Sequence, residues 1–353
     1  MLSARIDALA LTAINERIFP GCVVLAQRGG RVVHHAAYGS TMYGDPGSRP
    51  VARDTIYDIA SLTKPITATA ALALMDAGQI GLDDPAARYL PAMRASGVTL
   101  RHLLTHSSGL DIRLSALRER GAEAIREAAY DLVPIRPPGS YTMYANISTL
   151  LLGDVVAAAF GAPLDVAVGE LVIGPLGMAD TGYRPSEGLR SRIAPSEWDE
   201  EWRGGLVHGV AHDESAYALG GVAGHAGLFS TAADMGRFVA MWLQGGAWGG
   251  RQILRESTVA LAWRDHTGHM ATPSGLPLRS GLGWARDRSN YMGAAPEGTL
   301  GHTGFTGTAI VMLPGQQASL VVLTNRTYPR RTPPPYPHHA VIAAMVTALV
   351  GEG

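Results

Sequence analysis

The sequence predicts an α/β (α+β) fold, in which an antiparallel sheet built from both termini is flanked by helices and carries a large, mostly helical inserted domain. Three observations support this prediction. β-branched runs surround a Gly-Gly turn near the N-terminus and a Pro-Gly turn near the C-terminus, and Ala- and Leu-rich helical segments fill the middle. At 353 residues, the chain is long enough for two domains or for one domain with a large insertion.

The N-terminal part predicts a helix followed by a hairpin. Residues 1–19 carry charged side chains at helical spacing and lack the apolar stretch of a signal peptide. We therefore expect a cytoplasmic protein, unless an export signal was removed. Residues 20–39 alternate short β-branched runs around Arg28-Gly29-Gly30, which is typical of a hairpin. Cys22 is the only cysteine, so an intramolecular disulfide is excluded, and we expect it to be buried in a strand.

The middle of the chain predicts helices. One helical pattern starts at Ser61 and stops at Gly78, and further helices are expected at 147–161 and 230–246. We assign residues 61–264 to the mostly helical domain.

The C-terminal part returns to the sheet. A second hairpin is expected around Pro314-Gly315, followed by a stiff Pro-rich connector at 332–337 and a final helix. Residues 1–60 and 265–353 together form the predicted sheet domain. The active site is expected in the cleft between the two domains.

Composition excludes several classes of partner. Hydrophobic residues make up 46% of the chain and charged residues 17%, which is typical of a folded globular protein. The formal net charge is -1 and the pI is about 6.9, so no basic surface for nucleic acid or for an anionic membrane is indicated. No uninterrupted run of 18 apolar residues occurs, so we expect no membrane span. The predicted partner is a small-molecule or short-peptide substrate, and the oligomeric state is left open.

Lys64, in the segment SLTK, is the only lysine among 29 basic residues. Arginine is always charged, whereas a lysine with a lowered pKa can release its proton and act as a base. Pro65 is tolerated only near the start of a helix, which places Ser61 at a helix N-terminus. Three residues make nearly one turn, so we expect the amine beside the hydroxyl, as a base beside its nucleophile. The alternative is an ordinary surface cation.

Tyr144 and Asn146, in the segment YAN, are a second pair of candidates. A phenol could pass a proton to a leaving group, and an amide could hold the substrate. The alternative is a turn before the helix that starts near Ile147, with Asn146 as its N-cap. Both hypotheses can hold together.

The segment GHTGFTGT at 301–308 leads into the strand AIVML and is the third candidate. Its glycines would let a substrate backbone lie close to a strand edge. His302 and Thr303 would donate hydrogen bonds to a carboxylate or carbonyl group. The alternative is a Gly-rich turn between two strands.

Together, the three segments resemble those of the penicillin-recognising serine hydrolases, the superfamily of β-lactamases and D,D-peptidases, whose S-x-x-K and K-T-G motifs carry acyl-enzyme chemistry. The Tyr-x-Asn motif is similar to that of the class C β-lactamase branch, which includes D-alanyl-D-alanine carboxypeptidases, D-aminopeptidases and esterases. LLTHSSGL (103–110) and AGLFSTAADMGRF (226–238) resemble stretches common in that branch. The resemblance extends from about Cys22 to Arg326 and implies a β-lactamase/transpeptidase-like fold.

The resemblance also implies a role for each matching residue. Ser61 would be the nucleophile, Lys64 its base and Tyr144 the proton relay. The substrate would be bound by Asn146, His302, Thr303 and Gly304. The backbone N–H groups of Ser61 and Phe305 would form the oxyanion hole. Neither a cofactor nor a metal is implied.

One position departs from the β-lactamase pattern. His302 stands where β-lactamases usually have lysine, and His-Thr-Gly resembles the carboxypeptidase and D-peptidase members. We therefore expect a serine hydrolase that acts through an acyl-enzyme on an ester or amide, as an esterase or a D-peptidase-like amidohydrolase. The alternatives are a β-lactamase with true β-lactam hydrolysis and a catalytically inactive sensor or binding module.

A histidine-rich stretch suggests a metal site as a further alternative. His208, His212, Asp213 and His225 lie close in sequence, and two of the histidines have the i,i+4 spacing that binds zinc on a helix. The surrounding Gly and Val residues disfavour a helix, and no H-E-x-x-H pattern occurs. We therefore favour a loop that borders the cleft.

Four other residues are expected to be structural. His106, beside an apolar run, is expected to bond to the backbone. Arg326, Arg330 and Arg331 could bind a substrate carboxylate, but solvated charge is the favoured interpretation.

Overall fold

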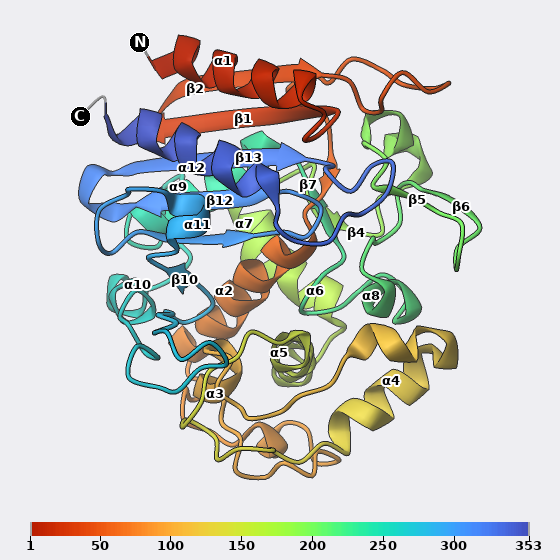
Figure 1. Cartoon of the computed structure of the whole chain (residues 1–353). Coiled ribbons are helices and arrows are strands. Elements are labelled where there is room, and N and C mark those ends of the chain that lie inside the picture. Colours follow the sequence, from red (N-terminus) through yellow and green to blue (C-terminus); the bar gives the residue numbers. More distant parts are fainter. Residues whose placement is uncertain (1, 352–353) are drawn as a thin grey trace.

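A six-stranded antiparallel sheet forms the centre of this computed structural model, which describes residues 2–351. The strand order is β10-β11-β12-β13-β1-β2, so the first strands of the chain pair with the last. Figure 1 shows the N-terminal and C-terminal segments side by side. The strands are β1 (Gly21–Arg28), β2 (Arg31–Gly39), β10 (Ala285–Arg286), β11 (Leu300–Thr303), β12 (Ala309–Leu313) and β13 (Ala318–Thr324).

Both predicted hairpins are present. β1 and β2 are joined by Gly29 and Gly30, whose positive φ angles of 55° and 73° suit a tight turn. β12 and β13 are joined by the 3₁₀ turn η6 (Pro314–Gln316). β1 pairs along its length with β13, which joins the two ends of the chain in one sheet.

Helices cover both faces of the sheet. On one face lie α1 (Leu2–Asn15) and α12 (Pro337–Val350), which contact each other, and on the other lies α9 (Ala232–Leu243). Alternate residues of β1 enter different cores, since Val24 packs with the terminal helices and Leu25 with the core that includes α9. Because both faces are covered, β1 is a continuous apolar run. The predicted fold class is confirmed.

The region between β2 and β10 is mostly helical, as predicted. α2 (Thr63–Asp76) lies at its centre and packs against α5 (Asn146–Phe160) (Figure 1). The other helices from α3 onward are α3 (Leu100–Leu104), α4 (Gly121–Tyr130), α6 (Leu164–Val168), α7 (Gly174–Leu176), α8 (Glu214–Ala218), α10 (Glu256–Ala262) and α11 (Ser289–Met292). No single helix between residues 2 and 351 has both the length and the hydrophobicity that a bilayer span requires.

Short strands also occur in this region, where the sequence predicts helices. They form the small sheets β3-β7-β4, β5-β6 and β8-β9. Their bounds are β3 (Tyr57–Asp58), β4 (Gly182–Tyr183), β5 (Glu197–Asp199), β6 (Gly205–Val207), β7 (Leu228–Ser230), β8 (Ala247–Trp248) and β9 (Arg251–Gln252). The separate domain at 61–264 stays a prediction, and α9 from within that range packs directly on β1 and β13.

The helix predicted from Ser61 begins with a 3₁₀ turn. η1 (Ala60–Leu62) leads directly into α2, so Ser61 lies in the turn at the N-terminal end of that helix. Gly78, with a φ of +74°, follows the C-cap and ends the helix as predicted. The N-cap prediction for Asn146 is wrong, because Ala145 caps α5 and Asn146 is its first residue.

Candidate active site

Ser61 and Lys64 are in contact at the N-terminal end of α2. Lys64 Nζ lies 2.8 Å from Ser61 Oγ and 3.0 Å from the backbone carbonyl oxygen of His225. Lys64 is only 1% exposed, because α2 is packed among α5, α6 and η1. The contact expected from the spacing of the two residues is therefore present, and it is buried.

Burial gives Lys64 an unusual charge state. It lowers the pKa of Lys64 from 10.5 to about 7, and the negative charge of Asp213 opposes this shift. Among the described residues, the amine bonds to a hydroxyl and a carbonyl and not to a carboxylate. A neutral amine can donate to the His225 carbonyl and accept the proton of the Ser61 hydroxyl. The contact is therefore suited to proton transfer.

Tyr144 lies over the same amine. Its ring centroid is 4.9 Å from Lys64 Nζ, and the rings of His106 and His302 lie 4.8 Å and 5.8 Å from it. The protein atoms around the phenol raise the pKa of Tyr144, although a hydrogen bond with Ser61 opposes the rise. The phenol is therefore protonated at neutral pH and can both donate and accept a proton beside the hydroxyl.

His106 bonds to the backbone, as the sequence predicts. Its Nδ1 accepts a hydrogen bond at 3.3 Å from the N–H of Ala145, the residue after Tyr144. Burial and the nearby charge of Lys64 lower the pKa of His106 to about 3, so the ring is neutral. His106 also lines the pocket beside Ser61, which its sequence context does not indicate.

The turn between β11 and β12 is fastened to the chain that precedes Ser61. Thr308 Oγ1 donates to the carbonyl oxygen of Ile59 at 3.1 Å. A Cβ on Gly304 would overlap that hydroxyl and that carbonyl, so the close approach requires glycine. The Gly304-Phe305 segment is thus held against the backbone just before the serine.

Asp58 supports the backbone in front of the serine. Ala60 has a φ of +45°, a conformation that costs about 1–3 kcal/mol for a residue with a side chain. The buried Asp58 carboxylate accepts hydrogen bonds from the N–H groups of Ala60 at 2.7 Å and His212 at 2.6 Å. Burial raises the pKa of Asp58, and these N–H groups oppose the rise. Sequence analysis missed this residue, because one acidic side chain before a helix is a common pattern.

His302 is buried, and its ring also lies beside that of Tyr144. Its Nδ1 lies 2.9 Å from the carbonyl oxygen of Thr303, and burial together with the charge of Lys64 lowers its pKa to about 3. A neutral ring that donates from Nδ1 leaves Nε2 as an acceptor. This differs from the donor role expected for His302, since the ring has no positive charge for a substrate carboxylate. Thr303 and Gly304 line the same pocket.

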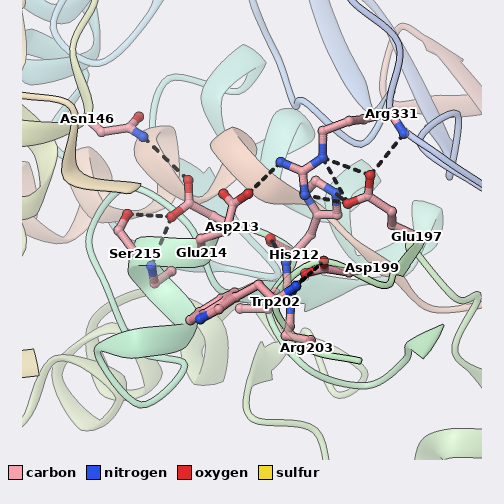
Figure 2. A network of polar contacts seen from close by, with 12 residues as sticks. Asn146, Glu197, Asp199, Trp202, Arg203, His212, Asp213, Glu214, Ser215 and Arg331 are labelled. Carbon is pink, nitrogen blue, oxygen red and sulfur yellow. Dashed lines mark hydrogen bonds and ion pairs between the residues drawn. The ribbon is translucent and has the colours of Figure 1, made fainter. Parts of the chain in front are cut away.

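Asn146 is directed to another protein group and does not line the pocket. Its Nδ2 donates to Asp213 Oδ2 at 3.4 Å, and Figure 2 shows the amide pointing at that carboxylate. Asp213 Oδ1 accepts hydrogen bonds from Ser215 Oγ at 2.6 Å and approaches His225 Nε2 at 3.2 Å. The structure thus reveals Asp213 as part of the site. The signal in the sequence is an Asp directly before a short helix.

The four residues considered as zinc ligands do not converge. His208 contacts backbone carbonyl oxygens, His212 contacts Glu197 at 3.0 Å, and His225 contacts Asp213. Across residues 2–351, no group of three or more ligating side chains gathers at one point. Each of these histidines therefore has its own hydrogen-bond partner, and the four residues share no common site.

Two of the three arginines near the Pro-rich connector are paired. Arg330 is exposed and contacts Glu200 at 2.7 Å. Arg331 contacts both Glu197 and Glu214 (Figure 2). For Arg331, the expected solvated charge is wrong, because the partly buried side chain pairs with two carboxylates.

The expectation of a solvated charge is also wrong for Arg326, because its side chain is buried. It is only 7% exposed, and its guanidinium carbon lies 4.7 Å and 4.3 Å from the ring centroids of Phe305 and Tyr336. Within the described part of the chain, its Nε and Nη1 have no hydrogen-bond partner. A buried guanidinium held between aromatic rings therefore lies at the edge of the site.

Ser61, His106, Tyr144, His302 and Arg326 line a pocket of 340 Å³. Its walls are largely apolar and aromatic, with Leu104, Leu278, Trp284, Tyr291, Phe305 and Tyr336 among them. Arg288 and Arg326 are its two guanidinium groups, and none of the described residues that line it is Asp or Glu. The pocket can therefore hold a small apolar group next to Ser61, with positive charge nearby.

A buried lysine in contact with a serine at a helix N-terminus, beside a largely apolar pocket, is the arrangement of a serine hydrolase. Comparison with known proteins agrees. The family model described as Beta-lactamase matches residues 6–344. The chain belongs to the β-lactamase family, and within it to the hydrolases related to carboxypeptidases and esterases.

Individual relatives carry names from both groups. A putative D-alanyl-D-alanine carboxypeptidase of Escherichia coli strain K12 is 31% identical over 352 residues, which cover 88% of this chain and 79% of the relative. Esterase EstB of Burkholderia gladioli is 33% identical over 276 residues, which cover 66% and 68%. The structure of EstCE1, a hydrolase with promiscuous acyltransferase activity, matches with a TM-score of 0.77 and 26% identity and covers 97% of this chain and 98% of that one.

Proposed function

We propose that this hydrolase cleaves an ester or amide through an acyl-enzyme formed on Ser61, with Lys64 as the base. The observation that carries the proposal is the sole lysine of the chain, which is buried, 2.8 Å from Ser61 Oγ, and has a pKa lowered to about 7. A purely structural cation could be an arginine, as it is at position 331.

The contacts support one step for each group. The Lys64 amine accepts the hydroxyl proton as Ser61 Oγ attacks the substrate carbonyl carbon. The bond from that carbon to the leaving group then breaks, a proton passes to the leaving group through Tyr144, and the acyl group stays on Oγ. Water hydrolyses the acyl-enzyme by the reverse proton path. The backbone N–H groups of Ser61 and Phe305 donate to the oxyanion, a contribution of about 3 kcal/mol for a typical donor.

The pocket favours an ester with a short acyl chain as the substrate. Its aromatic and aliphatic walls suit an apolar acyl group, and 340 Å³ leaves little space for a large one. His302 is neutral, so the cation that β-lactamases place here is missing. We therefore rank short-chain esters above β-lactams.

A D-peptidase-like amidohydrolase is the second candidate. The observation that favours it is Arg326, a buried guanidinium on the pocket wall with two nitrogens unpaired among the described residues. A substrate with a free carboxylate would complete those hydrogen bonds. A peptide substrate would then depend on Arg326, whereas a simple ester would not.

The test combines labelling with a substrate panel. A fluorophosphonate probe should label Ser61, located by peptide mass mapping, and Ser61→Ala should abolish both label and turnover. The panel of p-nitrophenyl esters, D-amino-acid p-nitroanilides, D-Ala-D-Ala peptides and nitrocefin is compared by kcat/KM. Short-chain esters should be turned over fastest, and nitrocefin slowly.

Three results would contradict the proposal in different ways. Nitrocefin hydrolysis at ~10⁶ M⁻¹s⁻¹ or more would make the protein an efficient β-lactamase. Turnover that a chelator abolishes, without a label on Ser61, would favour a metal hydrolase. Neither label nor turnover would favour a sensor or binding module.

A further inference from the structure

Asp213 joins α8, the start of α5 and the segment before β7, and the last of these contacts Lys64. It is the N-cap of α8, where its Oδ1 accepts hydrogen bonds from the N–H of Ala216 at 2.9 Å and from Ser215 Oγ at 2.6 Å. The same oxygen lies 3.2 Å from His225 Nε2. Three groups therefore converge on Oδ1.

The second carboxylate oxygen has a different partner. Asp213 Oδ2 accepts from Asn146 Nδ2 at 3.4 Å, at the first turn of α5 (Figure 2). A carboxylate can only accept, so it fixes which end of the Asn146 amide faces it. The amide oxygen of Asn146 is thereby kept on the opposite side.

The contact with His225 reaches Lys64 directly. The His225 side chain is fully buried between Asp213 and Ser215, and its backbone carbonyl accepts the hydrogen bond from Lys64 Nζ at 3.0 Å. The hydrogen bond to that carbonyl orients the amine and so directs its lone pair and its other N–H bonds. Asp213 therefore influences, through one intervening residue, how Lys64 faces Ser61.

Four groups near Lys64 keep one charge state near neutral pH. His106 and His302 stay neutral there, because burial lowers the pKa of each to about 3. Tyr144 stays protonated, since its pKa is raised. Burial would raise the pKa of Asp213, but His225, Ser215 and the Ala216 N–H hold it well below its usual range. The titratable and charged groups around the amine are thus Tyr144, His106, His302, His225 and Asp213, with Asp213 as the negative charge.

We propose that Asp213 is a positioning residue of this hydrolase, which holds the Asn146 amide and the His225 main chain around Lys64 and supplies the negative charge that faces the lysine. The inference rests on the proposed function, in which Lys64 is the base. A simple helix cap would also explain the contacts within α8. It would not explain the contacts to α5 and to the segment before β7.

The variant Asp213→Asn separates these two roles. Asparagine caps a helix as well as aspartate does, so the fold should be kept while the charge is lost. The rise of kcat/KM with pH, set by deprotonation of Lys64, should move to lower pH by about one unit, because the charged lysine loses its opposite charge. NMR of ¹³C-lysine-labelled protein reports the same shift directly, since the chain has one lysine.

Two further variants complete the test. Glu214→Gln, one residue along the same helix and paired with Arg331, is the matched control and should leave the profile in place. Asp213→Ser keeps a capping hydroxyl and should shift the profile in the same direction, which covers the case in which Asp213→Asn folds poorly.

Every outcome decides the question. A shift in both Asp213 variants but not in Glu214→Gln supports the inference. An unchanged profile in the Asp213 variants, or an equal shift in Glu214→Gln, overturns it, and Ser61 labelling that persists would leave the proposed function intact. Failure of the wild-type protein to be labelled on Ser61 would remove the proposed function and this inference together.

Discussion

Lys64 and Arg331 are two basic side chains, the first buried and the second partly exposed, and their surroundings give them opposite properties. Lys64 contacts a hydroxyl and a carbonyl, and burial lowers its pKa to about 7. Burial also disfavours the charge of Arg331, but hydrogen bonds to Glu197 and the nearby Glu214 raise its pKa above the usual value. Figure 2 shows this guanidinium between the two carboxylates.

The comparison shows how the position of the one lysine differs from that of a paired arginine. Where a cation must stay charged, carboxylates pair with it and arginine provides a planar fork that contacts two of them. Where a group must release its proton, an unpaired and desolvated amine is needed, and arginine cannot provide one. The identity of the cation and its partners therefore separate a catalytic position from a structural one.

The largest expected effect is that of Lys64→Arg. The substitution keeps a long basic side chain, but guanidinium stays protonated, so Ser61 loses its proton acceptor. We expect kcat/KM to fall by ~10²–10⁴ while the circular dichroism spectrum is unchanged. A folded variant that keeps more than about a tenth of wild-type kcat/KM would contradict the assignment of Lys64 as the base. Such a loss corresponds to less than ~1.4 kcal/mol in the activation barrier.

The matched substitution in the other network is Arg331→Lys. Lysine keeps the charge but cannot form the fork to Glu197 and Glu214, so stability should fall slightly while activity stays near that of the wild type. Thermal unfolding and the p-nitrophenyl ester assay measure the two effects. A loss of activity comparable to that of Lys64→Arg would remove the contrast between the networks.

An effect smaller than that of Lys64→Arg is expected for Glu197→Gln. The carboxylate of Glu197 contacts both His212 and Arg331, and the variant leaves Arg331 with Glu214 alone. Because Arg331 is 33% exposed, we expect a loss of about 2 kcal/mol in unfolding free energy, below the ~3–5 typical of a fully buried pair. Urea unfolding at pH 7 measures it.

The stability difference between wild type and Glu197→Gln should depend on pH in one direction. Burial would raise the pKa of Glu197, but hydrogen bonds from His212 and Arg331 hold it well below its usual range. A lowered carboxyl pKa adds stability above the unfolded pKa of about 4.3, and that stability is lost as pH falls. The difference between wild type and Glu197→Gln should therefore shrink below about pH 4. A constant difference would mean that the charge of Glu197 does not stabilise the fold.

The sequence predicts the parts that depend on local pattern. The two hairpins follow from Gly29-Gly30 and Pro314-Gly315, and the contact between Ser61 and Lys64 follows from their spacing ahead of Pro65. These features depend on neighbours in the chain. Local physical chemistry is therefore enough to find them.

The remaining parts depend on residues that are distant in sequence. Asp213 meets Asn146 across 67 positions, and Asp58 meets the backbone of His212 across 154. Arg326 is indistinguishable from the neighbouring arginines until the fold places it between two aromatic rings. No periodicity or spacing encodes such contacts, so the sequence alone could not reveal them.

The most direct test of the account is the titration of Lys64 in the wild-type protein. With one lysine in the chain, ¹³C-lysine labelling of a preparation without tag lysines gives one side-chain signal, which Lys64→Arg removes. The account predicts that its Cε shift titrates with a pKa of about 7. Titration near the ordinary value of 10.5 would show that the lysine is charged at neutral pH and would contradict its role as the base.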